Sequence, residues 1–183
     1  MKHSVNSALV LLLLVLLNAC GQTEKKEQGK ESKQQEIQQK VKASEGTVIK
    51  VGKGPDAMFL TPDKQKIYIA NVEDTTISVI NTQTDQVEKT ITGVRNPWGF
   101  SRLGTTNEVA VSAYDKQIVV IDFTKDEIVR QKEFNSTIGG IVSSKDGKTI
   151  FVIAIDEKKV WKLNAQSFVV LDTYETGNGP DGI

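Results

Sequence analysis

The chain has 183 residues, of which 38% are hydrophobic and 25% charged, and its formal net charge is zero. This balance excludes the basic surface typical of nucleic-acid-binding proteins, so we expect no nucleic acid partner. The only histidine is His3 and the only cysteine is Cys20. The rest of the chain therefore lacks the commonest general base and the commonest metal ligands.

The N-terminal residues 1–19 have the layout of a signal peptide. Lys2 and His3 precede an unbroken apolar run over residues 8–17, which ends shortly before Cys20. Ten residues of helix span only about 15 Å, whereas a bilayer core is about 30 Å thick. The run therefore predicts an export signal rather than a transmembrane helix.

The sequence Leu17-Asn18-Ala19-Cys20 resembles the lipobox of bacterial lipoproteins. This resemblance implies cleavage before Cys20 and attachment of a diacylglyceryl group, with fatty acids such as palmitate, to its sulfur. Acyl chains of this kind would hold the protein in a membrane. We expect the mature protein to be anchored on the extracytoplasmic side of the cell membrane, or in the outer membrane of a Gram-negative envelope; the alternative is a secreted chain with an incidental cysteine.

Residues 20–45 are rich in Lys, Glu, Gln and Ser and contain no aromatic residue. Such a composition cannot bury enough apolar surface to offset the entropy of ordering. We expect this segment to be a disordered tether between the lipid and the folded domain.

Residues 46–183 repeat themselves with a constant period. Ala57, Gly99, Gly140 and Gly182 lie 42, 41 and 42 residues apart. The repeats start near residues 54, 96, 138 and 179, and a period of 40 to 45 residues is typical of four-stranded β-propeller blades. The repeat therefore predicts an all-β fold of four-stranded antiparallel blades.

Turn residues divide the first repeat into four predicted strands, at residues 56–60, 66–71, 76–81 and 86–91. The second strand is apolar on both faces, as expected for an inner strand that is covered by blades on either side. The fourth alternates between apolar and polar residues, which indicates an outer edge with one face in water.

The first repeat resembles the YVTN β-propeller family. The likeness rests on Ile67-Tyr68-Ile69-Ala70-Asn71, on Ile77-Ser78-Val79-Ile80-Asn81-Thr82, and on the blade start Gly52-Lys53-Gly54-Pro55-Asp56. Members of this family resemble seven-bladed rings. The Gly-His and Trp-Asp pairs of WD40 repeats are absent from this sequence.

About three blades of such a ring are present. Residues 47–52 align with the fourth strand of a blade, so we expect an outer strand ahead of the first complete repeat. We interpret the chain as an open arc that exposes apolar surface on its end faces. Three explanations stay open: a truncated gene product, an incomplete sequence, or several chains that complete one ring.

We expect a non-enzymatic binding or scaffold module of the cell envelope, with an unknown envelope protein or polysaccharide as its ligand. The candidate ligand-binding residues lie at blade starts and in the loops after each second strand: Asp56, Glu73, Asp74, Trp98, Tyr114, Asp115, Asp156 and Asp181.

No catalytic residue, metal site or cofactor is predicted, because acids, histidines and arginines are too few at these positions. Covalent haem is excluded because no Cys-x-x-Cys-His motif occurs. The alternative is a lactonase-like or quinoprotein-related propeller enzyme, or a subunit of one, whose site lies in further blades; fold analogy alone does not establish that chemistry.

Overall fold

The computed structural model describes residues 46–183. The predicted signal peptide over residues 1–19, the lipid on Cys20 and the tether over residues 20–45 lie outside the described residues. In the described part the chain forms β-strands and no helix, and so it contains no helix that could cross a membrane.

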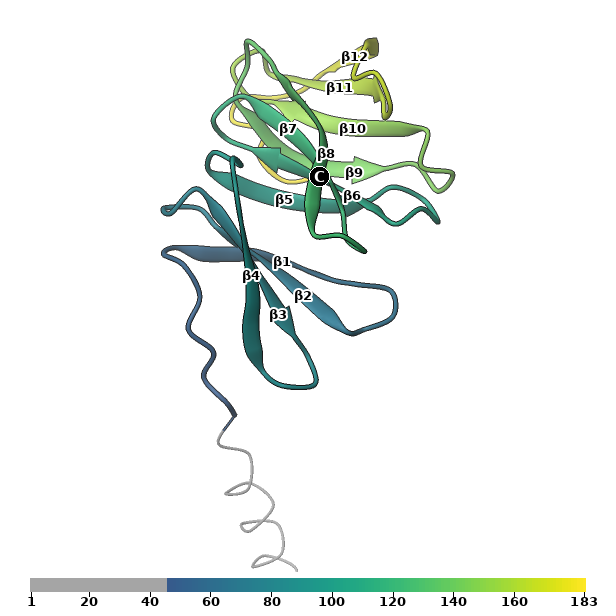
Figure 1. Ribbon diagram of the computed structural model, residues 1–183. Coiled ribbons are helices and arrows are strands. Elements are labelled where there is room, and N and C mark those ends of the chain that lie inside the picture. The colour runs from purple at the N-terminus through teal and green to yellow at the C-terminus, as the bar shows by residue number, and fades with distance from the viewer. Residues whose placement is uncertain (1–45) are drawn as a thin grey trace, which may run out of the picture. The chain divides into compact units, whose positions relative to one another are not determined.

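The strands form three sheets of four in chain order (Figure 1). The first sheet consists of β1 (Pro55–Leu60), β2 (Lys66–Asn71), β3 (Thr76–Asn81) and β4 (Gln86–Thr92). The second consists of β5 (Pro97–Arg102), β6 (Glu108–Ala113), β7 (Gln117–Asp122) and β8 (Glu127–Glu133). The third consists of β9 (Ile138–Ser143), β10 (Thr149–Ala154), β11 (Lys159–Asn164) and β12 (Val170–Glu175).

Each sheet is an antiparallel meander in which every strand pairs with the next one along the chain. The first strands of neighbouring sheets lie beside one another, β1 next to β5 and β5 next to β9. First strands are therefore the inner strands of the arrangement, and fourth strands are the outer edges. This is the predicted blade architecture, and the four predicted strands of the first repeat match β1 to β4 within one residue at each end.

The backbone repeats along with the sequence. Left-handed φ angles occur at Thr75, Lys116 and Lys158, in the turn after each second strand. They recur after each third strand, at Asp85, Asp126 and Phe168. The same turn geometry is thus built three times with different side chains.

Two apolar cores lie between the blades. One joins the first and second sheets and includes Tyr68, Val79 and Val111; the other joins the second and third sheets and includes Val120, Ile150 and Leu163. The middle sheet contributes side chains to both cores, so β6 and β7 are buried along almost their whole length. Such two-sided burial is what the continuous apolar strands of the sequence predict.

The segment ahead of the first blade differs from the prediction. Residues 47–52 are not a strand and pair with none of the twelve strands. A strand needs the edge of a neighbouring strand to satisfy its backbone hydrogen-bonding groups. Here the backbone hydrogen bonds to the first blade begin at residue 53. Lys53 and Gly54 accept backbone hydrogen bonds from the β2–β3 loop at 3.2 and 3.0 Å.

Large apolar side chains are exposed on all three sheets, including Val129 on β8 at 42%. Met58 on β1 is 69% exposed, and Leu171 on β12 is 54% exposed. Every residue of β12 is exposed, so this outer strand lacks the half-buried alternation of β4.

Candidate functional site

One backbone hydrogen bond recurs in each blade, and it places the equivalent loop residue at the same position in all three blades. The backbone N–H groups of Val72, Tyr114 and Ile155 each donate to a carbonyl of their own blade start at 3.0 Å. This bond holds the first residue of the loop after the second strand against the start of the first strand. Because first strands are innermost, these residues line one inner rim of the blades.

The second blade places two aromatic rings at this rim. Trp98 lies at the start of β5 and Tyr114 in the β6–β7 loop, and both are half-buried. Their ring centroids are 4.4 Å apart, with an angle of 42° between the planes. Tilted aromatic pairs at this distance stabilise one another, so the two rings present a fixed apolar surface.

A carboxylate from the start of the fourth repeat contacts this pair. The Tyr114 hydroxyl donates to Asp181 Oδ1 at 2.6 Å, and the backbone N–H of Gly140 donates to the Asp181 carbonyl at 2.7 Å. These two bonds fix the segment after β12 against the β6–β7 loop and the inner strand β9. Asp181 therefore reaches a tyrosine that precedes it by 67 residues.

Asp56, at the start of β1, contributes a negative charge that acts on the same tyrosine. The pKa of Tyr114 is raised well above its usual value, first by burial, then by its hydrogen bond to Asp181, and then by the negative charges of Asp181 and Asp56. We name Asp56, Trp98, Tyr114 and Asp181 the rim cluster. Three of the eight candidate residues thus come into contact, and the charge of Asp56 acts on them from the first repeat.

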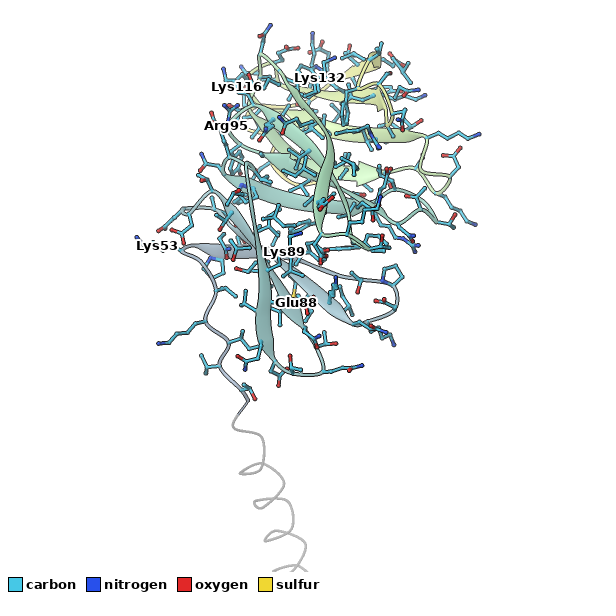
Figure 2. The ribbon with its side chains drawn as sticks, viewed as in Figure 1. Lys53, Glu88, Lys89, Arg95, Lys116 and Lys132 are labelled. Carbon is cyan, nitrogen blue, oxygen red and sulfur yellow. The ribbon has the colours of Figure 1, made fainter. Side chains whose placement is uncertain are left out.

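The other four candidates hold the loops in place. Asp74 accepts the backbone N–H of Lys53 at 2.7 Å, and Asp115 forms an ion pair with Arg95 at 2.9 Å. Figure 2 shows Arg95 close to Lys116, which follows Asp115 in the β6–β7 loop.

Asp156 accepts the backbone N–H of Thr137 at 2.9 Å and its hydroxyl at 3.1 Å. The backbone bond is the main reason that the pKa of Asp156 is lowered. The Glu73 side chain is exposed, and its backbone N–H donates to the Lys53 carbonyl at 3.2 Å. These residues stabilise turns, and the rim cluster is the candidate site.

Sequence reasoning missed a buried polar network between the first two blades. Asp126, in the β7–β8 turn, is 8% exposed, and it accepts hydrogen bonds from the Tyr68 hydroxyl and from Lys66 Nζ, the latter at 2.6 Å. Lys66 also pairs with Glu88 at 3.5 Å. No motif marks this network, because its partners lie on different blades and the other repeats have Asp85 and Phe168 at the position of Asp126.

The buried tyrosine makes stability sensitive to alkali. Burial and the hydrogen bond to Asp126 raise the pKa of Tyr68, so the folded state holds this proton more tightly than the unfolded chain, whose tyrosine pKa is about 10. The stabilisation is complete below that pH and is lost progressively as the pH rises from it towards the higher pKa of the folded state.

We expect the free energy of unfolding, measured by urea denaturation, to fall between about pH 9 and pH 11. The fall should be smaller in Tyr68→Phe, which has no proton to lose there. If the free energy of unfolding fell equally steeply with pH in the two proteins, Tyr68 would not be responsible for the fall.

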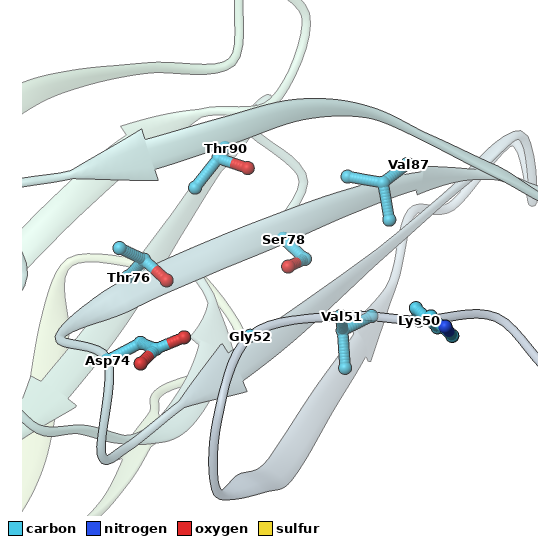
Figure 3. Close-up of a pocket in the computed structure, with 8 residues that line it drawn as sticks. All are labelled: Lys50, Val51, Gly52, Asp74, Thr76, Ser78, Val87 and Thr90. Atoms are coloured by element: carbon cyan, nitrogen blue, oxygen red, sulfur yellow. The ribbon is translucent and has the colours of Figure 1, made fainter.

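A polar pocket of about 350 Å³ lies apart from the rim cluster, between the leading segment and the first blade (Figure 3). Lys50, Val51 and Gly52 form one side, and the hydroxyl groups of Thr76, Ser78 and Thr90 face it. Asp74 is the one candidate residue that lines it.

Gly52 is required beside this pocket, because a β-carbon there would lie 2.7 Å from Asn71 Cγ. Across residues 46–183, no group of three or more His, Cys, Asp or Glu side chains is arranged to hold a metal ion.

Comparison with protein families gives one match of broad extent. A family described as a domain of unknown function, DUF5074, matches residues 38–178, well over half of the chain. The chain belongs to the DUF5074 family. No curated protein sequence matches it.

Solved structures similar to this DUF5074 chain show the same fold. One is hydrazine synthase of Kuenenia stuttgartiensis, with 17% sequence identity and a TM-score of 0.64; the match covers 76% of this chain and 41% of that one. Another is a crystal structure of the RRP9 WD40 repeats, with 12% identity and a TM-score of 0.61, covering 70% of this chain and 40% of that one.

The DUF5074 chain therefore spans about two fifths of each of these structures. At such low identities the likeness concerns the fold alone, and it supports a β-propeller-like protein of four-stranded blades.

Proposed function

We propose that this chain is a YVTN-type propeller lipoprotein that is anchored by a lipid on Cys20 and binds an envelope component without catalysing a reaction. The observation that carries the binding role is the rim cluster. Trp98, Tyr114 and Asp181 come from two repeats, and Asp56 adds its charge from a third. A fixed aromatic surface with carboxylates at its edge is suited to recognition.

The anchor is proposed from the sequence. Cys20 is the only cysteine, so incorporation of labelled palmitate in cells reports on that residue or its amino group. We expect the native chain to sediment with membranes and to be released by detergent, because its acyl chains bury many methylene groups.

The variant Cys20→Ala should lose the label. Lipid attachment precedes cleavage at such a site, so the variant should also keep residues 1–19 and migrate as a larger protein. A Cys20→Ala protein that still incorporated the label, or a native chain that incorporated none, would contradict the lipid anchor.

The binding role is tested with peptidoglycan sacculi, with isolated envelope polysaccharide and with purified envelope proteins immobilised on beads. We expect the detergent-solubilised full chain to bind one of these, and Trp98→Ala to weaken that binding about tenfold or more, as for aromatic residues at the centre of a binding site. Co-sedimentation over a range of protein concentrations gives the affinities.

Tyr174→Ala is the matched control. Tyr174 is an exposed tyrosine on β12 that also bonds to an aspartate, Asp172, at 3.1 Å. If Trp98→Ala and Tyr174→Ala bound as well as the native chain, the rim cluster would not be the binding site. Thermal unfolding of each variant separates loss of binding from loss of fold.

A further inference from the structure

The two carboxylates of the rim cluster have no basic partner. Within residues 46–183, Asp56 and Asp181 take part in no ion pair. The acids of the neighbouring loops differ: Asp115 pairs with Arg95 at 2.9 Å and Asp156 with Lys116 at 3.7 Å. The negative charge of the rim cluster is thus left uncompensated, unlike that of Asp115 and Asp156.

The free hydrogen-bonding groups of the rim cluster are mainly acceptors. The hydroxyl proton of Tyr114 is already donated to Asp181 Oδ1. The second oxygen of Asp181 and both oxygens of Asp56, which are exposed side chains, accept no side-chain hydrogen bond from the described residues. A ligand that fits these groups must donate hydrogen bonds.

The aromatic faces favour the same kind of ligand. Trp98 and Tyr114 are only half-buried, and their rings are held 4.4 Å apart. The face of an aromatic ring attracts a cation, and tryptophan is the best of the side chains for this interaction. An apolar stem can pack on the rings while the charged group reaches the carboxylates.

We propose that the rim cluster binds an organic cation on an apolar stem, namely a lysine or arginine side chain of an exported polypeptide. This inference rests on the proposed binding function and adds the chemical class of the ligand. The ammonium or guanidinium group bonds to Asp181, the negative charge of Asp56 adds to the attraction, and the stem lies on Trp98 and Tyr114.

The test compares two probes that differ only in the terminal ammonium group, N-acetyl-lysine amide and N-acetyl-norleucine amide, at equal ionic strength. The chain has two tryptophans, and Trp161→Phe leaves Trp98 as the sole indole reporter. Fluorescence of the detergent-solubilised full-length Trp161→Phe protein then follows binding. Trp161 is 6% exposed, so isothermal titration calorimetry on the native chain replaces this measurement if the variant does not fold.

We expect the lysine probe to bind at least about fivefold more tightly than the norleucine probe, in line with a cation–π contact together with charge-assisted bonds. Asp181→Asn and Asp56→Asn should each reduce that preference, and raising the salt concentration should weaken it. Asp172→Asn, at the matched Tyr174–Asp172 pair on β12, should leave it unchanged.

Equal binding of the two probes, or binding of neither, would overturn the cationic ligand. Tighter binding of glucosamine than of the lysine probe would overturn the polypeptide as its source. In each case the proposed function stands if binding of sacculi, polysaccharide or an envelope protein still depends on Trp98. It falls separately if none of these is bound, or if the binding is unaffected by Trp98→Ala.

Discussion

Replacing Asp126 with alanine is expected to lower the free energy of unfolding by about 3 kcal/mol, because it removes one partner of a buried charged network. Asp126 is 8% exposed and accepts hydrogen bonds from Tyr68 and Lys66. In the variant, the Tyr68 hydroxyl keeps only the weak bond to the Phe123 carbonyl, at 3.4 Å, and the Lys66 ammonium keeps only Glu88 as a partner, at 3.5 Å. Urea denaturation measures the loss.

The repeat supplies the control for this substitution. Asp85 occupies the same turn position in the first blade, with a φ of 54° against 56° for Asp126, but its side chain is exposed. Alanine at either position carries the same left-handed backbone cost, about 1 kcal/mol. The difference between Asp126→Ala and Asp85→Ala therefore isolates the network, and equal losses would show that the network contributes nothing.

Replacing Gly147 with alanine is expected to lower the free energy of unfolding by at least about 3 kcal/mol, since left-handed strain is joined by a clash with backbone atoms. Gly147 has a φ of 69°, and a β-carbon there would lie 2.7 Å from the carbonyl carbon of Leu103 and 2.8 Å from Gly104 N. A β-carbon at Gly104 would in turn lie 2.8 Å from the carbonyl carbon of Asp146. The turns of the second and third blades thus pack backbone to backbone.

Two further glycines separate the cost of the left-handed backbone from the cost of the steric clash. Gly179 has a φ of 66°, but a β-carbon there would meet nothing within 4 Å, and Gly177 has neither a positive φ nor a close neighbour. We expect Gly179→Ala to cost about 1 kcal/mol and Gly177→Ala to cost almost nothing. If Gly147→Ala were no worse than Gly179→Ala in thermal unfolding, the turns would be free to move apart.

Both predictions concern contacts between blades, and these contacts determine how the rim cluster is assembled. Tyr114 belongs to the second blade, and Asp181 follows the third. The distance between them depends on the packing of one blade on the next, which the turn at Gly147 and the core around Ile150 and Leu163 establish. A variant that loosens this packing should therefore weaken ligand binding as well as stability.

The sequence alone determined the period, the four strands of each blade and the all-β fold. These features follow from local chemistry. Apolar strands such as residues 66–71 are bounded by turn residues such as Asp63, whose carboxylate accepts the backbone N–H of Gln65 at 3.0 Å. Because each blade is built from hairpins between neighbouring strands, its hydrogen bonds are short-range and recur with the repeat.

The sequence also placed the candidate residues at blade starts and loops, but it did not separate the rim cluster from the others. All eight share the same types of position, and only the packing of the blades shows that Asp115 is neutralised by Arg95 while Asp181 faces Tyr114. The strand predicted over residues 47–52 was wrong for a related reason, since its pattern resembles β4 but no strand edge pairs with it.

Tertiary structure alone decided the contacts between blades. Tyr68 and Asp126 are 58 residues apart in the chain, and Tyr114 and Asp181 are 67 apart. Neither pair recurs in the other repeats, so the period carries no information about them. Their meeting depends on the stacking and relative twist of whole sheets, which arise from the summed packing of two apolar cores rather than from any local pattern.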